Sequence, residues 1–181
     1  MAGFGKESKH KKSKVSNKNT KSSHKNLITQ AVKFHLRGDV QKAAEFYQYF
    51  INQGFQDYRV FSNYGIILND LGKLKEAELL HRKAIELKPN SPDAYSNLGN
   101  VLRDFGKLKE AELSYRKAIE LKPNFPDAYS DLGTILKDLG KLKEAELSLQ
   151  KAIQLKPEFA DSHSRLGNIL SDLGKLKEAE L

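Results

Sequence analysis

The chain has 181 residues, enough for one ordinary domain or a short array of repeats. It contains no cysteine, which excludes disulfides and thiolate metal sites, and no apolar run long enough to span a membrane. Its formal net charge is +8, but residues 1–26 hold eight lysines and one acid, so the rest of the chain is nearly neutral.

Residues 1–23 are the first predicted segment, a tail rich in Lys, Ser and Asn. Because the tail has almost no apolar residues to bury, we expect it to be disordered. It lacks the apolar centre of a secretory signal and the arginines of a mitochondrial transit peptide, so we expect a cytoplasmic protein. The tail is either a solubilising extension or a weak contact for nucleic acid or an anionic membrane, and residues 10–14 also resemble a nuclear address.

The rest of the chain repeats itself. The string LGKLKEAEL occurs at residues 71–79, 139–147 and 173–181, and FGKLKEAEL occurs at residues 105–113. Each copy begins 34 residues after the previous one, a period typical of helical repeat arrays. We therefore divide the array into units 24–57, 58–91, 92–125, 126–159 and a truncated unit 160–181.

Each unit reads as two helices. In unit 92–125, apolar residues recur every three or four positions over residues 95–102 and again over 108–119. Gly106 suits a left-handed cap after the first helix, and Pro123 stops the second. Small residues are expected where the two helices cross, namely Gly65, Gly99, Gly133 and Gly167 on the first helices and Ala77, Ala111, Ala145 and Ala179 on the second.

The repeated string begins at the turn and continues into the second helix. In its first copy we expect Leu74 and Ala77 to face inward. The charged residues Lys73, Lys75, Glu76 and Glu78 are expected to form a solvated face that carries no function. A single helix pair is too small to close a core, so stacked neighbours must complete it and give an all-α solenoid.

This pattern resembles the tetratricopeptide repeat (TPR) over residues 24–181. Its signature positions in unit 92–125 are Tyr95, Leu98, Gly99, Leu102, Ala111, Tyr115, Ala118 and Pro123. The first unit departs from the pattern, with Ala31 in the glycine position, Phe50 in an alanine position and Phe55 in place of the proline, and the fifth has His163 in the aromatic position. The resemblance implies a right-handed solenoid of helix–turn–helix repeats.

TPR arrays bind extended peptides or partner helices in a groove lined by the first helices. The resemblance implies that the second, fifth, sixth, ninth, twelfth and thirteenth positions of each unit line it. The candidate binding residues are Asn63, Asn97, Asn100, Arg103, Asp131, Thr134, Lys137, Arg165 and Asn168. The lining is acidic and poor in lysine, so it should repel the terminal carboxylate that chaperone-tail clamps hold. The asparagines instead resemble the ladder in the TPR arm of protein O-GlcNAc transferases, where an amide can pair with any peptide backbone.

We therefore predict a non-catalytic scaffold that binds a protein or peptide. No phosphate-binding loop, catalytic triad or HExxH string is present, the histidines are scattered, and we expect neither a cofactor nor a metal. The alternative is that the chain is the substrate-recognition arm of a larger transferase, as in similar bacterial TPR proteins that continue into a glycosyltransferase, sulfotransferase or methyltransferase domain. The unit 160–181 stops partway, so we expect either a fragment of a longer protein or a frameshift or assembly break. Its uncapped apolar stripe could mediate self-association.

Overall fold

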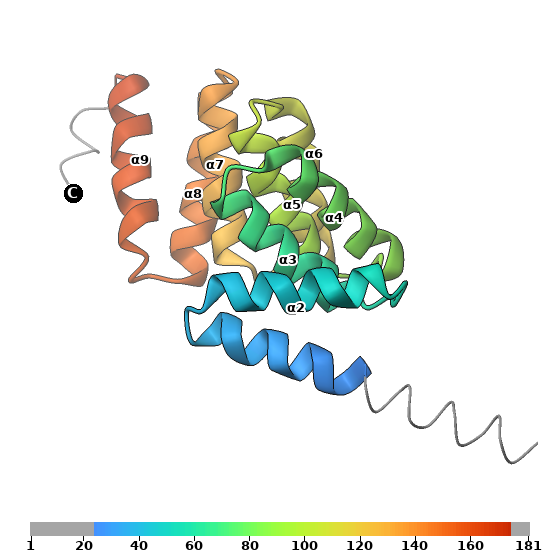
Figure 1. Cartoon of the computed structure of the whole chain (residues 1–181). Coiled ribbons are helices and arrows are strands. Elements are labelled where there is room, and N and C mark those ends of the chain that lie inside the picture. The colour runs from blue at the N-terminus through green and yellow to red at the C-terminus, as the bar shows by residue number, and fades with distance from the viewer. Residues whose placement is uncertain (1–23, 175–181) are drawn as a thin grey trace, which may run out of the picture. The chain divides into compact units, whose positions relative to one another are not determined.

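The computed structural model describes residues 24–174. Within this range the chain forms nine helices and no strand, which confirms the predicted all-α fold (Figure 1). They span residues 24–36, then α2 (Val40–Asn52), α3 (Tyr58–Asp70), α4 (Leu74–Leu87), α5 (Pro92–Asp104), α6 (Leu108–Leu121), α7 (Pro126–Asp138), α8 (Leu142–Leu155) and α9 (Ala160–Asp172). The expectations for the tail and for the final copy of the string, Ala179 included, concern residues outside the described range.

The chain divides into two compact units, Met1–Val60 and Phe61–Leu181. In the first unit, helix 24–36 and α2 pack through aromatic rings, with the Phe34 and Phe46 centroids 5.4 Å apart. Of the three departures from the repeat pattern in this unit, Ala31 and Phe50 are buried and Phe55 is half-buried. The divergent first helix pair therefore still buries the positions that the repeat pattern assigns to its core.

In the second unit, each helix from α4 to α9 packs on the next helix along the chain, and α7 also contacts α9 (Figure 1). We call α3, α5, α7 and α9 the first helices and α4, α6 and α8 the second helices. The first helices begin at residues 58, 92, 126 and 160, at intervals of 34 residues. All of these contacts lie within one repeat or between adjacent repeats, which is the arrangement of a solenoid.

The turn after each first helix explains the Gly-Lys pair of the repeated string. At the end of α5, Gly106 has a φ of 77°, the left-handed conformation that glycine adopts without strain. Its N–H donates to the carbonyl of Arg103 at 2.8 Å, and the N–H of Lys107 donates to the carbonyl of Leu102 at 2.8 Å. These two bonds form a Schellman motif, which satisfies carbonyls that the helix end leaves open. The predicted glycine cap is confirmed.

Prolines mark the end of the second helix of one pair and the start of the first helix of the next pair, as between α6 and α7. Lys122, which follows α6, has a φ of −140° and precedes Pro123, a position where helical conformation is disfavoured. Pro126 occupies the first turn of α7, where its missing N–H costs no hydrogen bond, and Asp127 follows it near the positive end of the helix dipole. The helix boundaries thus follow from local chemistry.

The two helices of a pair cross closely at the predicted glycine. A Cβ built on Gly99 would lie 2.8 Å from a ring carbon of Tyr115, closer than real side chains approach. Tyr115 and Ala111 are fully buried at this crossing. The same contact joins Gly65 to His81 and Gly133 to Leu149. Three different side chains therefore fill one equivalent position, each against a glycine.

His81 is the polar member of this set. Its side chain is almost completely buried, and its Nδ1 has no hydrogen-bond partner among the described residues. Burial lowers the pKa of His81 from its usual 6.5 to about 4, because the charged imidazolium loses its hydration. The histidine is therefore neutral at physiological pH.

Candidate functional site

The first helices of the second unit share a face of mostly polar side chains, which we call the polar row. It comprises the second, fifth, sixth, ninth, twelfth and thirteenth positions of each repeat, which recur on one side of a helix. The second position of unit 58–91, Arg59, lies before Phe61, where the second unit begins, so it is not counted in the row. The members within the second unit are Ser62, Asn63, Ile66, Asn69, Asp70, Asp93, Ser96, Asn97, Asn100, Arg103, Asp104, Asp127, Ser130, Asp131, Thr134, Lys137, Asp138, Asp161, Ser164, Arg165, Asn168, Ser171 and Asp172. All nine predicted binding residues belong to it.

Hydrogen bonds between neighbouring first helices join the row from α3 to α5. The amide of Asn97 donates to Oγ of Ser62 at 3.3 Å, and the amide of Asn69 donates to a carboxylate oxygen of Asp104 at 3.1 Å. Both bonds link residues 35 positions apart, so each joins one repeat to the next. Asn97 is half-buried.

Two arginines meet one aspartate at the middle of the row. Nη1 of Arg165 lies 3.3 Å from Oδ1 of Asp131, and Nη1 of Arg103 lies 3.7 Å from the same oxygen. Burial raises the pKa of Asp131, and the two arginines only partly oppose it, while nearby Asp127 adds to the increase. The structure thus brings together three predicted residues that lie on α5, α7 and α9.

A buried hydroxyl lies beneath this charged group. Ser130 accepts hydrogen bonds from Nη1 of Arg165 at 3.1 Å and from Oγ of Ser162 at 2.9 Å. Its carbonyl accepts from Oγ1 of Thr134 at 3.3 Å. Ser130, at a position that the resemblance assigned to the groove lining, is almost fully buried, as is Ser162. Thr134, a predicted binding residue, therefore uses its hydroxyl within its own helix.

The remaining predicted residues differ in their hydrogen bonds, ion pairs and exposure to solvent. Oδ1 of Asn100 accepts a 2.7 Å hydrogen bond from the buried hydroxyl of Tyr115, which fixes the amide. Lys137 forms an ion pair with Asp172 at 3.1 Å. Asn63 is half-buried, whereas Asn168 is exposed. The row therefore contains asparagines with a structural role as well as one that projects into solvent.

The second helices carry a different set of contacts, and here one expectation was wrong. Glu78, predicted to be solvated, is largely covered and accepts hydrogen bonds from Lys107 and Arg82, each at 2.9 Å. Nη2 of Arg82 also forms an ion pair with Oε2 of Glu110, at 3.0 Å. Burial alone would raise the pKa of Glu78, but the hydrogen bonds from the two cations lower it below its usual value.

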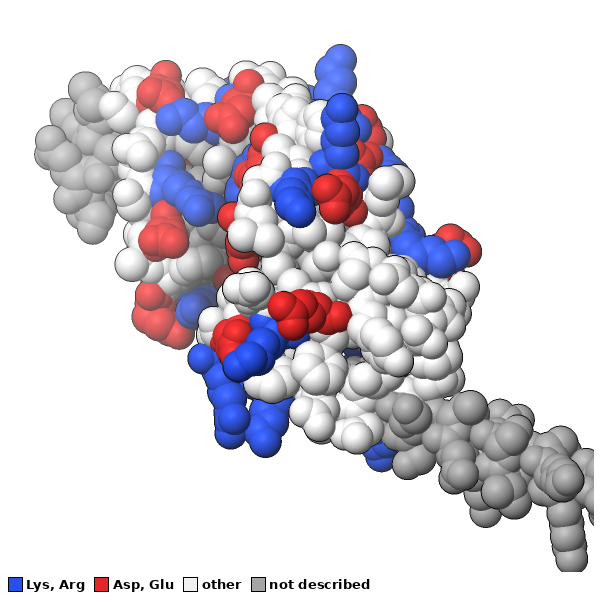
Figure 2. All heavy atoms as spheres, in the orientation of Figure 1, with Lys and Arg blue, Asp and Glu red and all other residues white. Residues whose placement is uncertain are grey.

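The next repeat copies this set. Lys141 contacts Glu112 at 2.8 Å, Arg116 contacts Glu112 at 2.9 Å, and Arg116 contacts Glu144 at 2.6 Å. We call the two sets together the ion-pair ladder. In the view of Figure 2, Lys and Arg lie beside Asp and Glu rather than in patches of one sign. The string LGKLKEAEL thus supplies a lysine to the preceding copy and a glutamate to the following copy.

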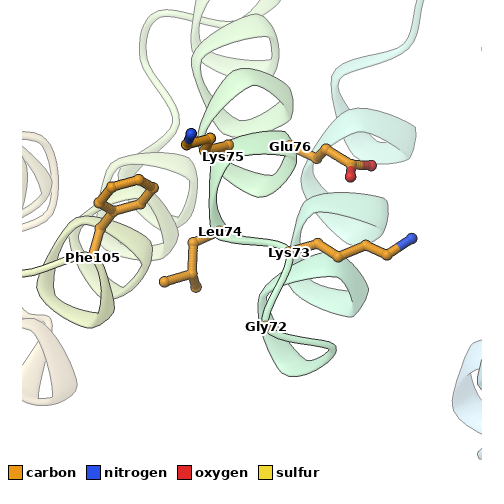
Figure 3. A pocket seen from close by; sticks show the side chains of 6 residues that line it. All are labelled: Gly72, Lys73, Leu74, Lys75, Glu76 and Phe105. Atoms are coloured by element: carbon orange, nitrogen blue, oxygen red, sulfur yellow. The ribbon is translucent and has the colours of Figure 1, made fainter.

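A shallow pocket of about 390 Å³ lies beside the turn between α3 and α4. Figure 3 shows Leu74 and Lys75 on the side nearer Phe105, while Lys73 and Glu76 extend away from it. The pocket is open, and no predicted binding residue lines it.

The described residues contain neither a cluster of metal-ligating side chains nor a membrane-spanning helix. Within residues 24–174, no three side chains of the His, Cys, Asp and Glu types are grouped as metal ligands would be. Among the described helices, none has the length and hydrophobicity needed to cross a bilayer.

The helix pairs, their 34-residue spacing and the glycine crossings define a class of α-helical repeat protein. The profile of the TPR repeat matches residues 65–104, 99–140 and 133–174, and the chain belongs to this family. Comparison with curated proteins gave no match.

Solved structures have the same fold. MamA from Desulfovibrio magneticus RS-1 is 24% identical, with a TM-score of 0.79 over 87% of this chain and 89% of that one. YrrB, described as a TPR protein with an unusual peptide-binding site, is 22% identical, with a TM-score of 0.72 over 84% of this chain and 79% of its own. TTC0263, a TPR protein from Thermus thermophilus, is 20% identical, with a TM-score of 0.68 over 86% of each chain.

Proposed function

We propose that this protein is a non-catalytic scaffold that binds an extended peptide or a partner helix along the polar row. The observation that carries the proposal is the continuity of the row across four first helices, where polar contacts join each repeat to the next. A continuous polar face offers a ligand many contacts, whereas a single repeat offers few. The peptide-binding site named for YrrB, a protein of the same fold, supports this proposal.

The amides of the row supply the chemistry for a peptide backbone. Asn97 uses an N–H in its bond to Ser62, so its carbonyl oxygen can accept from a peptide N–H. Asn100 uses its carbonyl oxygen in its bond to Tyr115, so its two amide hydrogens can donate to a peptide carbonyl. Exposed Asn168 can do both. Together these residues match the alternating donors and acceptors of an extended chain, whatever its sequence.

The transferase-arm alternative uses the same face, because an acceptor peptide would lie on the same row. The contact of the tail with nucleic acid or an anionic membrane, the self-association through the last unit and the cytoplasmic location stay predictions.

The test is binding of a library of random twelve-residue peptides to the full chain, followed by the affinity of the best peptide for a triple variant. The variant carries Asn97→Ala, Asn100→Ala and Asn168→Ala, and we expect affinity to fall at least about tenfold, as three lost hydrogen bonds permit. A matched control, Asn90→Ala with Asn124→Ala, removes two exposed amides from loops outside the row.

Thermal unfolding of each variant separates binding from folding, because Asn97 and Asn100 also make internal hydrogen bonds. Asn168→Ala alone, at an exposed position, should weaken binding without changing the melting temperature. Unchanged affinity in both the single and the triple variant would remove the polar row as the binding site.

A further inference from the structure

The charge of the polar row is opposite to that of the whole chain. The row holds eight aspartates, Asp70, Asp93, Asp104, Asp127, Asp131, Asp138, Asp161 and Asp172, against three cations, Arg103, Lys137 and Arg165. The chain as a whole carries +8. A ligand that docks on this face therefore meets a negative field.

The three cations of the row are already engaged. Arg103 contacts Asp104 and Asp131, Arg165 contacts Asp131, and Lys137 contacts Asp172. Five aspartates remain exposed and have no ion-pair partner within residues 24–174: Asp70, Asp93, Asp127, Asp138 and Asp161. The excess negative charge is therefore available to a ligand.

Three of these free carboxylates form a line that runs across successive repeats, because Asp93, Asp127 and Asp161 lie in the first turns of α5, α7 and α9. Asp70 and Asp138 end α3 and α7, and the engaged Asp104 lies between them at the end of α5. Side-chain contacts join α3 to α5, α5 to α7 and α7 to α9, so successive first helices lie beside one another. Packed helices are usually about 8 to 10 Å apart, and we take this as the spacing of the line.

This spacing selects a particular ligand. A peptide in the extended polyproline II conformation advances about 3.1 Å per residue with three residues per turn, so side chains three residues apart lie on the same face, about 9 Å apart. A lysine at every third position would place one ammonium group beside each aspartate of the line. A peptide rich in Asp or Glu would meet repulsion at each of these points.

We propose that the ligand of the polar row is an extended, lysine-rich segment of a partner protein, with few acidic residues and lysines near every third position. This inference rests on the proposed peptide-binding function and adds the chemistry of the partner. Residues 1–23 of the chain itself have a similar composition, with Lys6, Lys9 and Lys12 three residues apart, and are the competing occupant that the test must separate.

The experiment measures fluorescence anisotropy of three labelled probes with the full chain: (Lys-Ser-Asn)₆, (Gln-Ser-Asn)₆ and (Glu-Ser-Asn)₆. We expect the lysine probe to bind at least about tenfold more tightly than the glutamine probe, and its affinity to fall with added salt. The glutamate probe should show the weakest binding of the three.

Two variants locate the interaction. Asp93→Asn with Asp127→Asn and Asp161→Asn removes the line, and we expect the lysine probe to bind about tenfold more weakly. Asp70→Asn with Asp138→Asn removes acids near helix C-termini, where losing a negative charge does not destabilise the helix, so its effect reports binding alone. The control Glu76→Gln, Glu86→Gln and Glu120→Gln makes the same charge change on the second helices, away from the row, and should leave binding unchanged.

The outcomes separate the two proposals. Equal binding of the lysine and glutamine probes would overturn the charge inference and leave the peptide-binding function intact. Failure of all three probes, together with failure of the random library, would overturn both. If the lysine probe binds only after the seven lysines of residues 1–23 are changed to Gln, the chain's own segment is the occupant, and the partner-protein proposal is overturned.

Discussion

The second helices α4, α6 and α8 carry nearly the same charged residues, whereas the first helices differ from one another along the polar row. The sixth position reads Asn63, Asn97, Asp131 and Arg165, and the ninth reads Ile66, Asn100, Thr134 and Asn168. On the second helices, Glu78 and Glu112 each meet a lysine of the following copy, and Glu110 and Glu144 each meet an arginine of the preceding repeat, so the copies have to be complementary to one another. The row has no such requirement on its exposed side. Uniform residues therefore hold the array together, and the residues of the row are free to vary.

A substitution at the crossing of a first helix with its second helix should lower the unfolding free energy most, because the packing of both helices depends on that contact. Gly99→Val would place three carbons against the buried ring of Tyr115. We expect a loss of about 3 kcal/mol in unfolding free energy, the upper end for overpacking a core, measured by urea denaturation. Lys109→Val puts the same side chain on an exposed position of α6 and should change stability by less than about 1 kcal/mol. Equal effects of the two variants would contradict the close crossing.

His81 adds a pH dependence to one crossing. The folded chain lowers the pKa of His81 from 6.5 to about 4, so the unfolded chain binds the proton more readily. The stability from this histidine is present above its ordinary pKa and is lost as pH falls from there toward the folded value. We expect a loss of about 2 kcal/mol between about pH 7 and about pH 5, measured by denaturant unfolding at each pH.

A matched variant tests the cause. His81→Leu copies Leu149, which fills the equivalent position against Gly133, and it should remove this part of the pH dependence. If the variant loses stability over the same range as the parent chain, another group is responsible.

Loss of one carboxylate from the ion-pair ladder should lower the unfolding free energy less than the changes at the helix crossings. Glu112→Gln removes the carboxylate that holds Lys141 and Arg116, and we expect a loss of about 1 kcal/mol that shrinks with added salt. Burial opposes ionisation of Glu112, but its two hydrogen-bonded cations lower its pKa overall. Its contribution is therefore present above the usual glutamate pKa of 4.5 and is lost as pH falls through the lower folded value.

The control for the ladder is Glu120→Gln. Glu120 pairs only with Lys117 in its own helix and is largely exposed, so we expect a change below about 0.5 kcal/mol. Similar losses in the two variants would mean that contacts between repeats contribute no more than local ones.

The smallest effect on stability is expected in the row. Lys137→Ala removes an exposed ion pair with Asp172 and should change the unfolding free energy by less than about 0.5 kcal/mol. The same variant makes the row more acidic, so binding of the lysine probe should tighten about twofold. Weaker binding of the probe would show that Lys137 contacts the ligand in another way.

The sequence was sufficient to predict the features that depend on nearby residues. The cap at Gly106 follows from the conformational freedom of glycine, and the stop before Pro123 follows from the missing N–H and the ring of proline. The contact of Gly99 with Tyr115 follows from the absence of a side chain at a position expected to be buried. Each depends on local chemistry and a simple helical period.

The features that the sequence missed depend on register between repeats. Glu78 was expected to face solvent because its own helix gives it no reason to be covered, but Lys107 reaches it from 29 residues away. The hydrogen bond from Ser162 to Ser130 likewise requires two first helices at a known offset. The positions of Asn97 and Asn100 in the row could be predicted, but the bonds that orient them could not.

The regularity of the ion-pair ladder has a consequence for how such a gene can change length. If the 34 residues of unit 92–125 were deleted in frame, Lys141 would take the place of Lys107 opposite Glu78, and Glu144 would take the place of Glu110 opposite Arg82. Every ion pair at the new junction would join the same residue types as before. Duplication of the unit would preserve the pairs in the same way. Recombination between near-identical copies could therefore lengthen or shorten the polar row one repeat at a time without leaving a charge of the ion-pair ladder unmatched.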